Sequence, residues 1–197
     1  TRLQVEHPVT EMITGLDLVE LQLRIAEGEP LPPSVTEARI DGHAIEVRLY
    51  AEDVAAGFLP ATGTLHTFAI DGDVRVDAGV TSGSAVSPHY DPMLAKVIAH
   101  GATRADAVRA LTRALATARI HGVTTNRDLL VGILREPEFR AGRTDTGYLT
   151  RHDPAALCAA PDPLPFAVAA ALAAQARNRA EARVLTSIPS GYRNVGG

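Results

Sequence analysis

Polar and apolar residues alternate over the first six positions of the chain. Leu3 and Val5 are apolar, while Arg2, Gln4 and Glu6 alternate with them. Successive side chains of a strand point to opposite faces, so this pattern predicts a strand with the three polar side chains in one row. A cation, an amide and a carboxylate in one row can bind a small oxyanion and take a proton from it. The plainer interpretation is a half-buried strand with a solvated polar face, because short alternating runs are common.

Helical periodicity follows over residues 16–27, where an apolar stripe of leucine and isoleucine opposes an acidic polar stripe. Gly28 and the prolines after it are expected to end this helix. Because the polar stripe is acidic, we expect the helix to pack on the protein and not on a membrane. A helical turn over residues 8–13, ended by Gly15, is expected before it.

The middle of the chain alternates as strands do. Residues 43–51 place their apolar side chains on one face, with Glu46 and Arg48 on the other. Frequent Gly and Pro between short strands indicate an antiparallel sheet, for which a small barrel is one arrangement. Further strands are expected at 64–70, 74–76 and 93–100, the first two joined by a turn at 71–73.

Helical patterns return in the second half of the chain, so the fold class is α+β. Thr103 with Asp106 has the spacing of a capping box and predicts a helix through about residue 118, with Val108, Leu111 and Leu115 inward. Further helices are expected from 125 to near 137 and over 145–151. An Ala- and Pro-rich segment at 153–165 predicts a linker, and Asp162–Pro163 predicts the start of an Ala-rich helix through about 183.

Composition narrows the class of protein. A hydrophobic content of 46% and a charged content of 21% fit a globular protein with a real core. The net charge is −4, the basic residues are dispersed and aromatic residues make up 4%, so we expect no nucleic-acid partner. Cys158 is the one cysteine, which excludes an intramolecular disulfide. No apolar run approaches a membrane span and no signal peptide is visible, so we expect a cytoplasmic protein.

The opening run continues into Glu6-His7-Pro8-Val9-Thr10-Glu11, and the whole of residues 1–11 closely resembles the signature near the active site of biotin carboxylases, enzymes of the ATP-grasp superfamily. Further family blocks follow in the same order, which argues strongly against a chance match over residues 1–152. These blocks are His43–Asp53, Phe58–Gly63 (with Ala61 and Thr62 as departures), Tyr90–Lys96 and Gly122–Asn126.

The resemblance implies roles for the matching residues. In biotin carboxylases, ATP and bicarbonate give carboxyphosphate, which releases carbon dioxide to carboxylate the ureido nitrogen of biotin. By resemblance, Arg2, Gln4 and the backbone N–H of Val5 hold bicarbonate, and Glu6 is the general base that takes its proton. Arg48 is implied to bind biotin and to stabilise its enolate-like oxygen. Arg2, Glu6 and Arg48 are therefore the expected catalytic residues, and no metal ligand is expected.

The chemistry of these residue types agrees with the roles. A guanidinium binds a planar anion through paired donors and stays charged, and a positioned base contributes roughly 10²–10⁴-fold to a rate. Without the resemblance, Glu6 would be a surface carboxylate and Arg48 would pair with an acid such as Glu46. His7 could orient Glu6 or cap the following turn, and we favour the structural role. The other histidines are expected to be structural, since they lack metal-ligand spacing.

The resemblance also implies a division of the chain. Residues 1–35 are expected to be the end of the ATP-grasp catalytic region, 36–152 the biotin carboxylase C-terminal domain, and 153–197 a linker and helical tail toward a biotin carrier domain. There is no glycine-rich phosphate loop and no Met-Lys-Met biotinylation site. We therefore expect ATP and Mg²⁺ or Mn²⁺ to bind mainly upstream, biotin to be carried on another domain, and this fragment to be inactive alone.

The tail around residues 187–194 looks like the connecting region of fused acyl-CoA carboxylase α subunits. This suggests an acetyl-CoA or propionyl-CoA carboxylase of fatty acid biosynthesis, with a carboxyltransferase subunit as partner and a homodimer formed around Arg75. The same domain of a pyruvate or urea carboxylase remains an alternative, as does a non-catalytic module for dimerisation or carrier docking. The acyl substrate stays open, because acyl-CoA binds to the carboxyltransferase.

Overall fold

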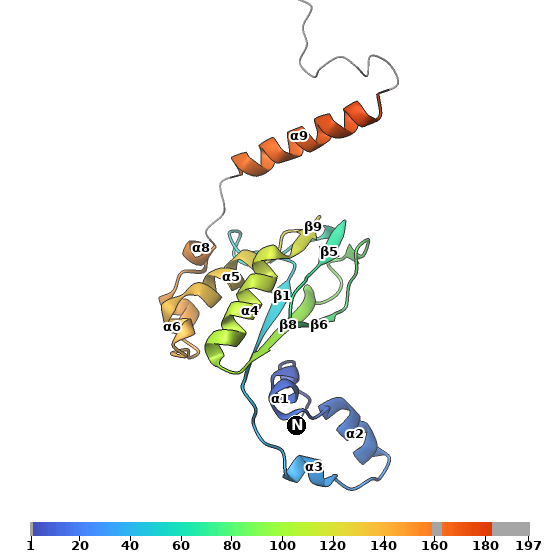
Figure 1. Ribbon diagram of the computed structural model, residues 1–197, viewed down its shortest axis with the longest axis vertical. Helices are drawn as coiled ribbons and strands as arrows, with labels where there is room; N and C mark the ends of the chain where they lie inside the picture. The colour runs from blue at the N-terminus through green and yellow to red at the C-terminus, as the bar shows by residue number, and fades with distance from the viewer. Residues whose placement is uncertain (1, 159–162, 183–197) are drawn as a thin grey trace, which may run out of the picture. The chain divides into compact units, whose positions relative to one another are not determined.

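A three-stranded antiparallel sheet in the order β1-β8-β6 lies at the centre of the larger of two units (Figure 1). The computed structural model describes residues 2–158 and 163–182, and the two units are residues 1–159 and 160–197. Strand β1 (His43–Tyr50) pairs with β8 (Met93–Gly101), and β8 pairs with β6 (Arg75–Ala78). The antiparallel arrangement and the α+β fold class are as predicted.

One face of this sheet forms the main core. Ile45 and Leu49 of β1 are 8% and 0% exposed, as the alternation predicts. Ile45 packs with Val97 of β8 and with Leu111 and Leu115 of helix α4, which extends over Arg104–Thr117. Burial of such aliphatic side chains stabilises the fold by roughly 1.5–3 kcal/mol each. The opposite face of the sheet is therefore left for the polar residues of β1.

Helix α4 and the helix after it follow local signals. Thr103 and Asp106 form the predicted capping box, with each side chain accepting from the backbone N–H of the other. Helix α5 (Arg127–Arg135) begins after Asn126, which is 6% exposed. Asn126 accepts from the Tyr50 N–H at 3.0 Å and donates to the Arg48 carbonyl at 3.2 Å. This buried amide therefore ties the start of α5 to the end of β1.

Among the described residues, the remaining strands form three two-stranded sheets. The prediction that a turn at 71–73 pairs the strands at 64–70 and 74–76 is wrong. Strand β5 (Thr67–Ala69) pairs with β9 (Arg119–His121), which the sequence did not indicate, while β6 pairs with β8. The two segments separate because Phe68 packs in a second apolar cluster and Val76 against the main core. The other pairs are β2 (Glu52–Asp53) with β3 (Leu59–Pro60) and β4 (Gly63–Thr64) with β7 (Ala85–Val86).

The predicted opening strand is also wrong. Residues 2–4 have no regular structure, residues 5–6 form a turn, and α1 (His7–Thr14) begins directly after it. A strand needs a neighbour for its backbone hydrogen bonds, and in the described part of the chain none pairs with residues 2–4. Val5 is 37% exposed instead of being packed behind a polar row.

The first helix after the opening turn ends where predicted, and the second ends at Ala26 with Glu27 as its C-cap, one residue before the predicted Gly28. Gly15 is left-handed (φ +71°) at the end of α1, and its N–H donates to the Glu11 carbonyl at 2.8 Å. Helix α2 (Leu18–Ala26) is capped by Asp17, whose side chain accepts from the Glu20 N–H at 2.8 Å. No residue of α2 is fully buried, and a short helix α3 (Pro33–Thr36) follows.

The predicted linker contains a helix. Three short helices follow α5, and the last of them falls within residues 153–165. Gly132 of α5 allows this helix to approach, because a Cβ there would lie 2.1 Å from the Leu157 carbonyl oxygen. These helices are α6 (Pro137–Arg140), α7 (Tyr148–Arg151) and α8 (Pro154–Leu157).

The smaller unit contains α9 (Leu164–Ala180), close to the helix predicted over 163–183. Its apolar side chains are exposed, with Phe166 at 64% and Leu172 at 59%. Asp162 and the segment 187–194 lie outside the described residues. Among the described residues, no helix combines the length and the apolar character that crossing a membrane requires.

Candidate functional site

An ion pair joins the turn before α1 to strand β1. Arg48 Nη2 lies 2.8 Å from Glu6 Oε2, with side-chain exposures of 42% and 52%. Arg48 projects from the polar face of β1, since Ile45 and Leu49 on the other face are buried. The structure therefore brings together the expected base and the expected biotin-binding residue, although 42 positions separate them.

Lys96, the one lysine of the sequence, lies beside this pair. It is paired with Arg48 in the register of β1 and β8. Its ammonium donates to the Val5 carbonyl at 3.2 Å and lies 3.3 Å from Asp77 Oδ2 of β6. Lys96 thereby holds the backbone of the turn that carries Glu6 against the sheet.

A second ion pair continues the polar face under α1. Arg75 of β6 lies 2.7 Å from Glu11 Oε2 and 2.8 Å from Asp77 Oδ1. Glu11 is 8% exposed, and its other oxygen accepts from the Leu18 N–H at 2.8 Å. Burial raises the pKa of Asp77, but hydrogen bonds from Arg75 and Lys96 outweigh it and lower that pKa. Hydrogen bonds from Arg75 to Asp77 and Glu11 raise the pKa of the Arg75 guanidinium.

Glu46 lies on the same face of β1 without a hydrogen-bond partner. Both of its carboxylate oxygens are buried, and neither has a partner among the described residues. Burial raises the pKa of Glu46, and the charges of Lys96 and Arg48 oppose that shift. The pairing of Arg48 with Glu46 that the bare pattern suggested is absent, because Glu6 takes that guanidinium.

Arg2 and Gln4 line a groove of about 360 Å³ between the opening segment and the helices that follow. Both side chains are exposed, and in the described structure neither forms a hydrogen bond or ion pair with Glu6 or Arg48. The backbone N–H of Val5 donates to no described group. The bicarbonate-binding roles of Arg2, Gln4 and Val5 therefore stay predictions, because the strand meant to align them is not formed.

The groove also contains His7 and the apolar side chains of α2, with residues of α3 at its end. His7 does not cap the following turn: its Nδ1 lies 2.8 Å from the Gln4 carbonyl oxygen in the preceding turn, and the start of α1 has no side-chain cap. The lining is completed by Leu3, Thr10, Leu18, Leu21, Gln22, Ile25, Leu31 and Val35.

One group with metal-ligand chemistry occurs among the described residues, at Glu136, Glu138 and His152. The polar side-chain atoms of these three residues already form hydrogen bonds within the group and with neighbouring side chains. Glu138 lies 2.7 Å from His152 Nε2 and accepts from Arg151 at 3.0 Å, and both contacts lower the pKa of Glu138. The Tyr148 hydroxyl donates to Glu136 at 3.2 Å. Burial raises the pKa of Tyr148 to about 12. Through these hydrogen bonds and ion pairs the group connects α6 to α7.

Sequence reasoning missed Lys96, Asp77 and Glu46 as neighbours of the site. Lys96 was visible as the one lysine of a matched block, and Glu46 as the residue two positions before Arg48. Their convergence depends on which of three separate strands lie side by side. The alternation within one strand indicates which face it buries but does not identify the strand that pairs with it.

Two family profiles match the chain. The profile described as "Biotin carboxylase C-terminal domain" covers residues 46–151, and that described as "Carbamoyl-phosphate synthase L chain, ATP binding domain" covers residues 1–34.

Individual proteins agree with the profiles. The mitochondrial methylcrotonoyl-CoA carboxylase subunit alpha of Arabidopsis thaliana is 49% identical over 155 residues, which are 77% of this chain and 21% of the relative. A biotin carboxylase of Halalkalibacterium halodurans is 47% identical over 154 residues, 77% of this chain and 34% of the relative. The chain thus spans about a fifth to a third of the relatives it matches.

A solved structure shows the same fold. It is the biotin carboxylase domain dimer of the 2-oxoglutarate carboxylase of Hydrogenobacter thermophilus, in complex with MgADP, ADP and bicarbonate. The TM-score is 0.77 at 40% identity, and the match covers 82% of this chain and 36% of that one.

Proposed function

The chain belongs to the family of biotin carboxylase C-terminal domains, and we propose that it is the C-terminal part of a biotin carboxylase that carboxylates carrier-bound biotin. The single observation that carries this proposal is the Glu6–Arg48 pair, because it joins the expected base to the expected biotin-binding cation.

In this proposal Glu6 removes the proton of bicarbonate. Its carboxylate is half-exposed and lies 2.8 Å from the Arg48 guanidinium, so a small substrate can reach it. Arg2, Gln4 and the Val5 N–H are proposed to hold bicarbonate beside it. That role requires the opening segment to adopt the alignment of the predicted strand, with Val5 N–H free to donate.

Arg48 is proposed to stabilise the oxygen of deprotonated biotin. Only its Nη2 contacts Glu6, so the guanidinium can use its other N–H groups or turn away from Glu6 to do so. An exposed ion pair contributes about 0–1 kcal/mol, so opening this half-exposed pair costs little compared with a new bond to developing negative charge. The pair is thus a resting arrangement from which both side chains can reach substrates.

The residues of the site fit biotin and bicarbonate better than ATP. The one lysine, Lys96, already binds Asp77 and the Val5 carbonyl, and the sequence has no glycine-rich phosphate loop. We therefore assign ATP and Mg²⁺ or Mn²⁺ mainly to residues outside this chain, where ATP supplies the phosphoryl group that activates bicarbonate.

The proposed division of the chain is 1–35, 36–152 and 153–197, with the last part leading toward a biotin carrier domain. An acyl-CoA carboxylase with a carboxyltransferase partner is the first candidate for the whole protein, and acetyl-CoA or propionyl-CoA the first substrates. A pyruvate or urea carboxylase is the alternative. A homodimer in the cytoplasm is proposed as its state.

The test is ATP cleavage that depends on bicarbonate and biotin. The full-length parent protein should show it, and the 197-residue chain alone should not. Cleavage by the isolated chain would overturn its proposed inactivity. A parent without any biotin-dependent cleavage would overturn the function.

A further inference from the structure

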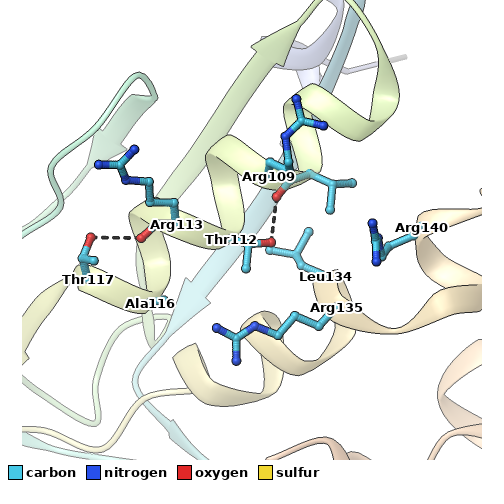
Figure 2. Close-up of a pocket in the computed structure, with 9 residues that line it drawn as sticks. Arg109, Thr112, Arg113, Ala116, Thr117, Leu134, Arg135 and Arg140 are labelled. Carbon is cyan, nitrogen blue, oxygen red and sulfur yellow. Dashed lines mark hydrogen bonds between the residues drawn. The ribbon is translucent and has the colours of Figure 1, made fainter.

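Four arginines surround a pocket of about 570 Å³ between helices α4, α5 and α6 (Figure 2). Arg109 and Arg113 come from α4, Arg135 is the last residue of α5, and Arg140 is the last residue of α6. All four side chains are exposed. This pocket is separate from the groove that Arg2 and Gln4 line.

Helix periodicity explains why the cations gather here. Arg109 and Arg113 are four residues apart, so they lie on one face of α4. Val108 and Leu134 beneath them are 4% and 1% exposed and belong to the main core. The pocket therefore has a fixed aliphatic floor and a cationic rim, with Thr112, Ala116 and Thr117 completing its lining.

The charge of this rim is largely uncompensated. Arg109 pairs with Asp106. Across the described residues, no carboxylate lies within ion-pairing distance of Arg113, Arg135 or Arg140, and no acidic residue lines the pocket. A bound anion would therefore meet cations that no carboxylate of the described residues neutralises, and opposite charges attract more strongly near a protein surface than in bulk water.

We propose that this pocket binds a small molecule that carries two phosphate groups next to an apolar portion, of the nucleoside diphosphate class. Guanidinium groups bind phosphate oxygens through paired, charge-assisted hydrogen bonds. Cations on both walls suit more than one phosphate, and the aliphatic floor suits a non-polar part of the ligand. The volume lies within the roughly 300–1,000 Å³ of small-molecule sites.

The geometry disfavours nucleic acid and separates this pocket from the proposed catalytic pair. No aromatic side chain lines the pocket, so bases of a single strand would have no stacking platform. Val97 of β8 packs toward α4, whereas the adjacent Lys96 reaches Val5 on the other face of the sheet. The inference therefore does not depend on the proposed function.

Isothermal titration calorimetry of the 197-residue chain tests the proposal, with ADP, pyrophosphate and adenosine as probes at low ionic strength. ADP should bind most tightly, pyrophosphate more weakly, and adenosine not measurably. The double variant Arg135→Gln/Arg140→Gln should weaken ADP binding about ten-fold or more, because it removes two charge-assisted contacts. Both residues are exposed at helix ends, and circular dichroism checks that the variant is folded.

Arg39→Gln is the matched control, since Arg39 is exposed and lies outside the pocket lining. ADP should bind this variant as it binds the unmodified chain. The proposal is overturned if ADP does not bind, if adenosine binds equally well, or if the double variant and the control lose the same affinity. Binding of an acidic peptide in place of ADP would also contradict it and would identify a protein-docking surface.

Discussion

Arg48 pairs with Glu6, 42 positions away in the sequence, and not with Glu46, which is two positions away on the same face of β1. This pairing keeps the expected base and the expected biotin-binding cation in contact. It leaves Glu46 as a buried carboxylate without a hydrogen-bond partner, and an unpartnered buried carboxylate lowers the stability of the fold.

Replacing Glu46 by leucine should therefore stabilise the protein at pH 7. An unsatisfied buried polar group costs roughly 1–3 kcal/mol, and an apolar side chain of similar size avoids that cost. The free energy of unfolding, measured by urea titration, should rise in Glu46→Leu. The exposed Glu37→Leu is the control and should change it little. A destabilised Glu46→Leu variant would show that the carboxylate has a stabilising partner after all.

The unpartnered Glu46 carboxylate should also make the free energy of unfolding depend on pH. The pKa of Glu46 is raised in the folded state, so the folded state holds its proton more tightly than the unfolded state does. Stability should then fall as the pH rises from the ordinary carboxyl range through the folded pKa. Urea titrations between pH 4 and pH 8 should show this fall in the unmodified chain and a smaller one in Glu46→Leu. Identical profiles would contradict the assignment.

Arg75 should stabilise the contact between α1 and the sheet. Arg75→Met leaves Glu11 as a buried carboxylate without its cation, which should cost roughly 1.5–3 kcal/mol in the free energy of unfolding. Arg24→Met is the control, because its ion pairs with Glu20 and Glu29 are exposed. Equal effects of the two substitutions would argue against a structural role for the Arg75–Glu11 pair.

Asp77 should contribute stability that is lost in acid. Arg75 and Lys96 lower its pKa in the folded state, so the contribution is present above the ordinary carboxyl range and disappears as the pH falls through the folded pKa. In Asp77→Asn the stability difference from the unmodified chain should therefore shrink below pH 4. A difference that stays constant down to pH 2 would contradict this.

Gly132 should be required for α8 to pack on α5. A Cβ at this position would lie 2.1 Å from the Leu157 carbonyl oxygen, so Gly132→Ala should displace α8 and cost roughly 1–3 kcal/mol. Hydrogen exchange over residues 154–158 should become faster. Gly79→Ala is the control, because a Cβ there meets no atom within 4 Å. Unchanged exchange in Gly132→Ala would show that the two helices do not need this close approach.

Elements with local signals were predictable from the sequence, and those that depend on distant partners were not. Thr103 and Asp106 specify the start of α4 through contacts within one turn. The pairing of β5 with β9 has no such signal, because its partners are about fifty residues apart in the sequence. Glu6 and Arg48 were identified through the resemblance of their segments to biotin carboxylases, whereas the strand register that places Lys96 beside them was not predicted.

The central claim, that Glu6 and Arg48 are the base and the biotin-binding cation of a biotin carboxylase, is tested most directly by the rate of biotin carboxylation in the full-length parent protein. Glu6→Gln and Arg48→Gln should each lower that rate by roughly 10²–10⁴-fold, while the control Arg39→Gln should leave it unchanged. Near-normal rates in either Glu6→Gln or Arg48→Gln would contradict the claim.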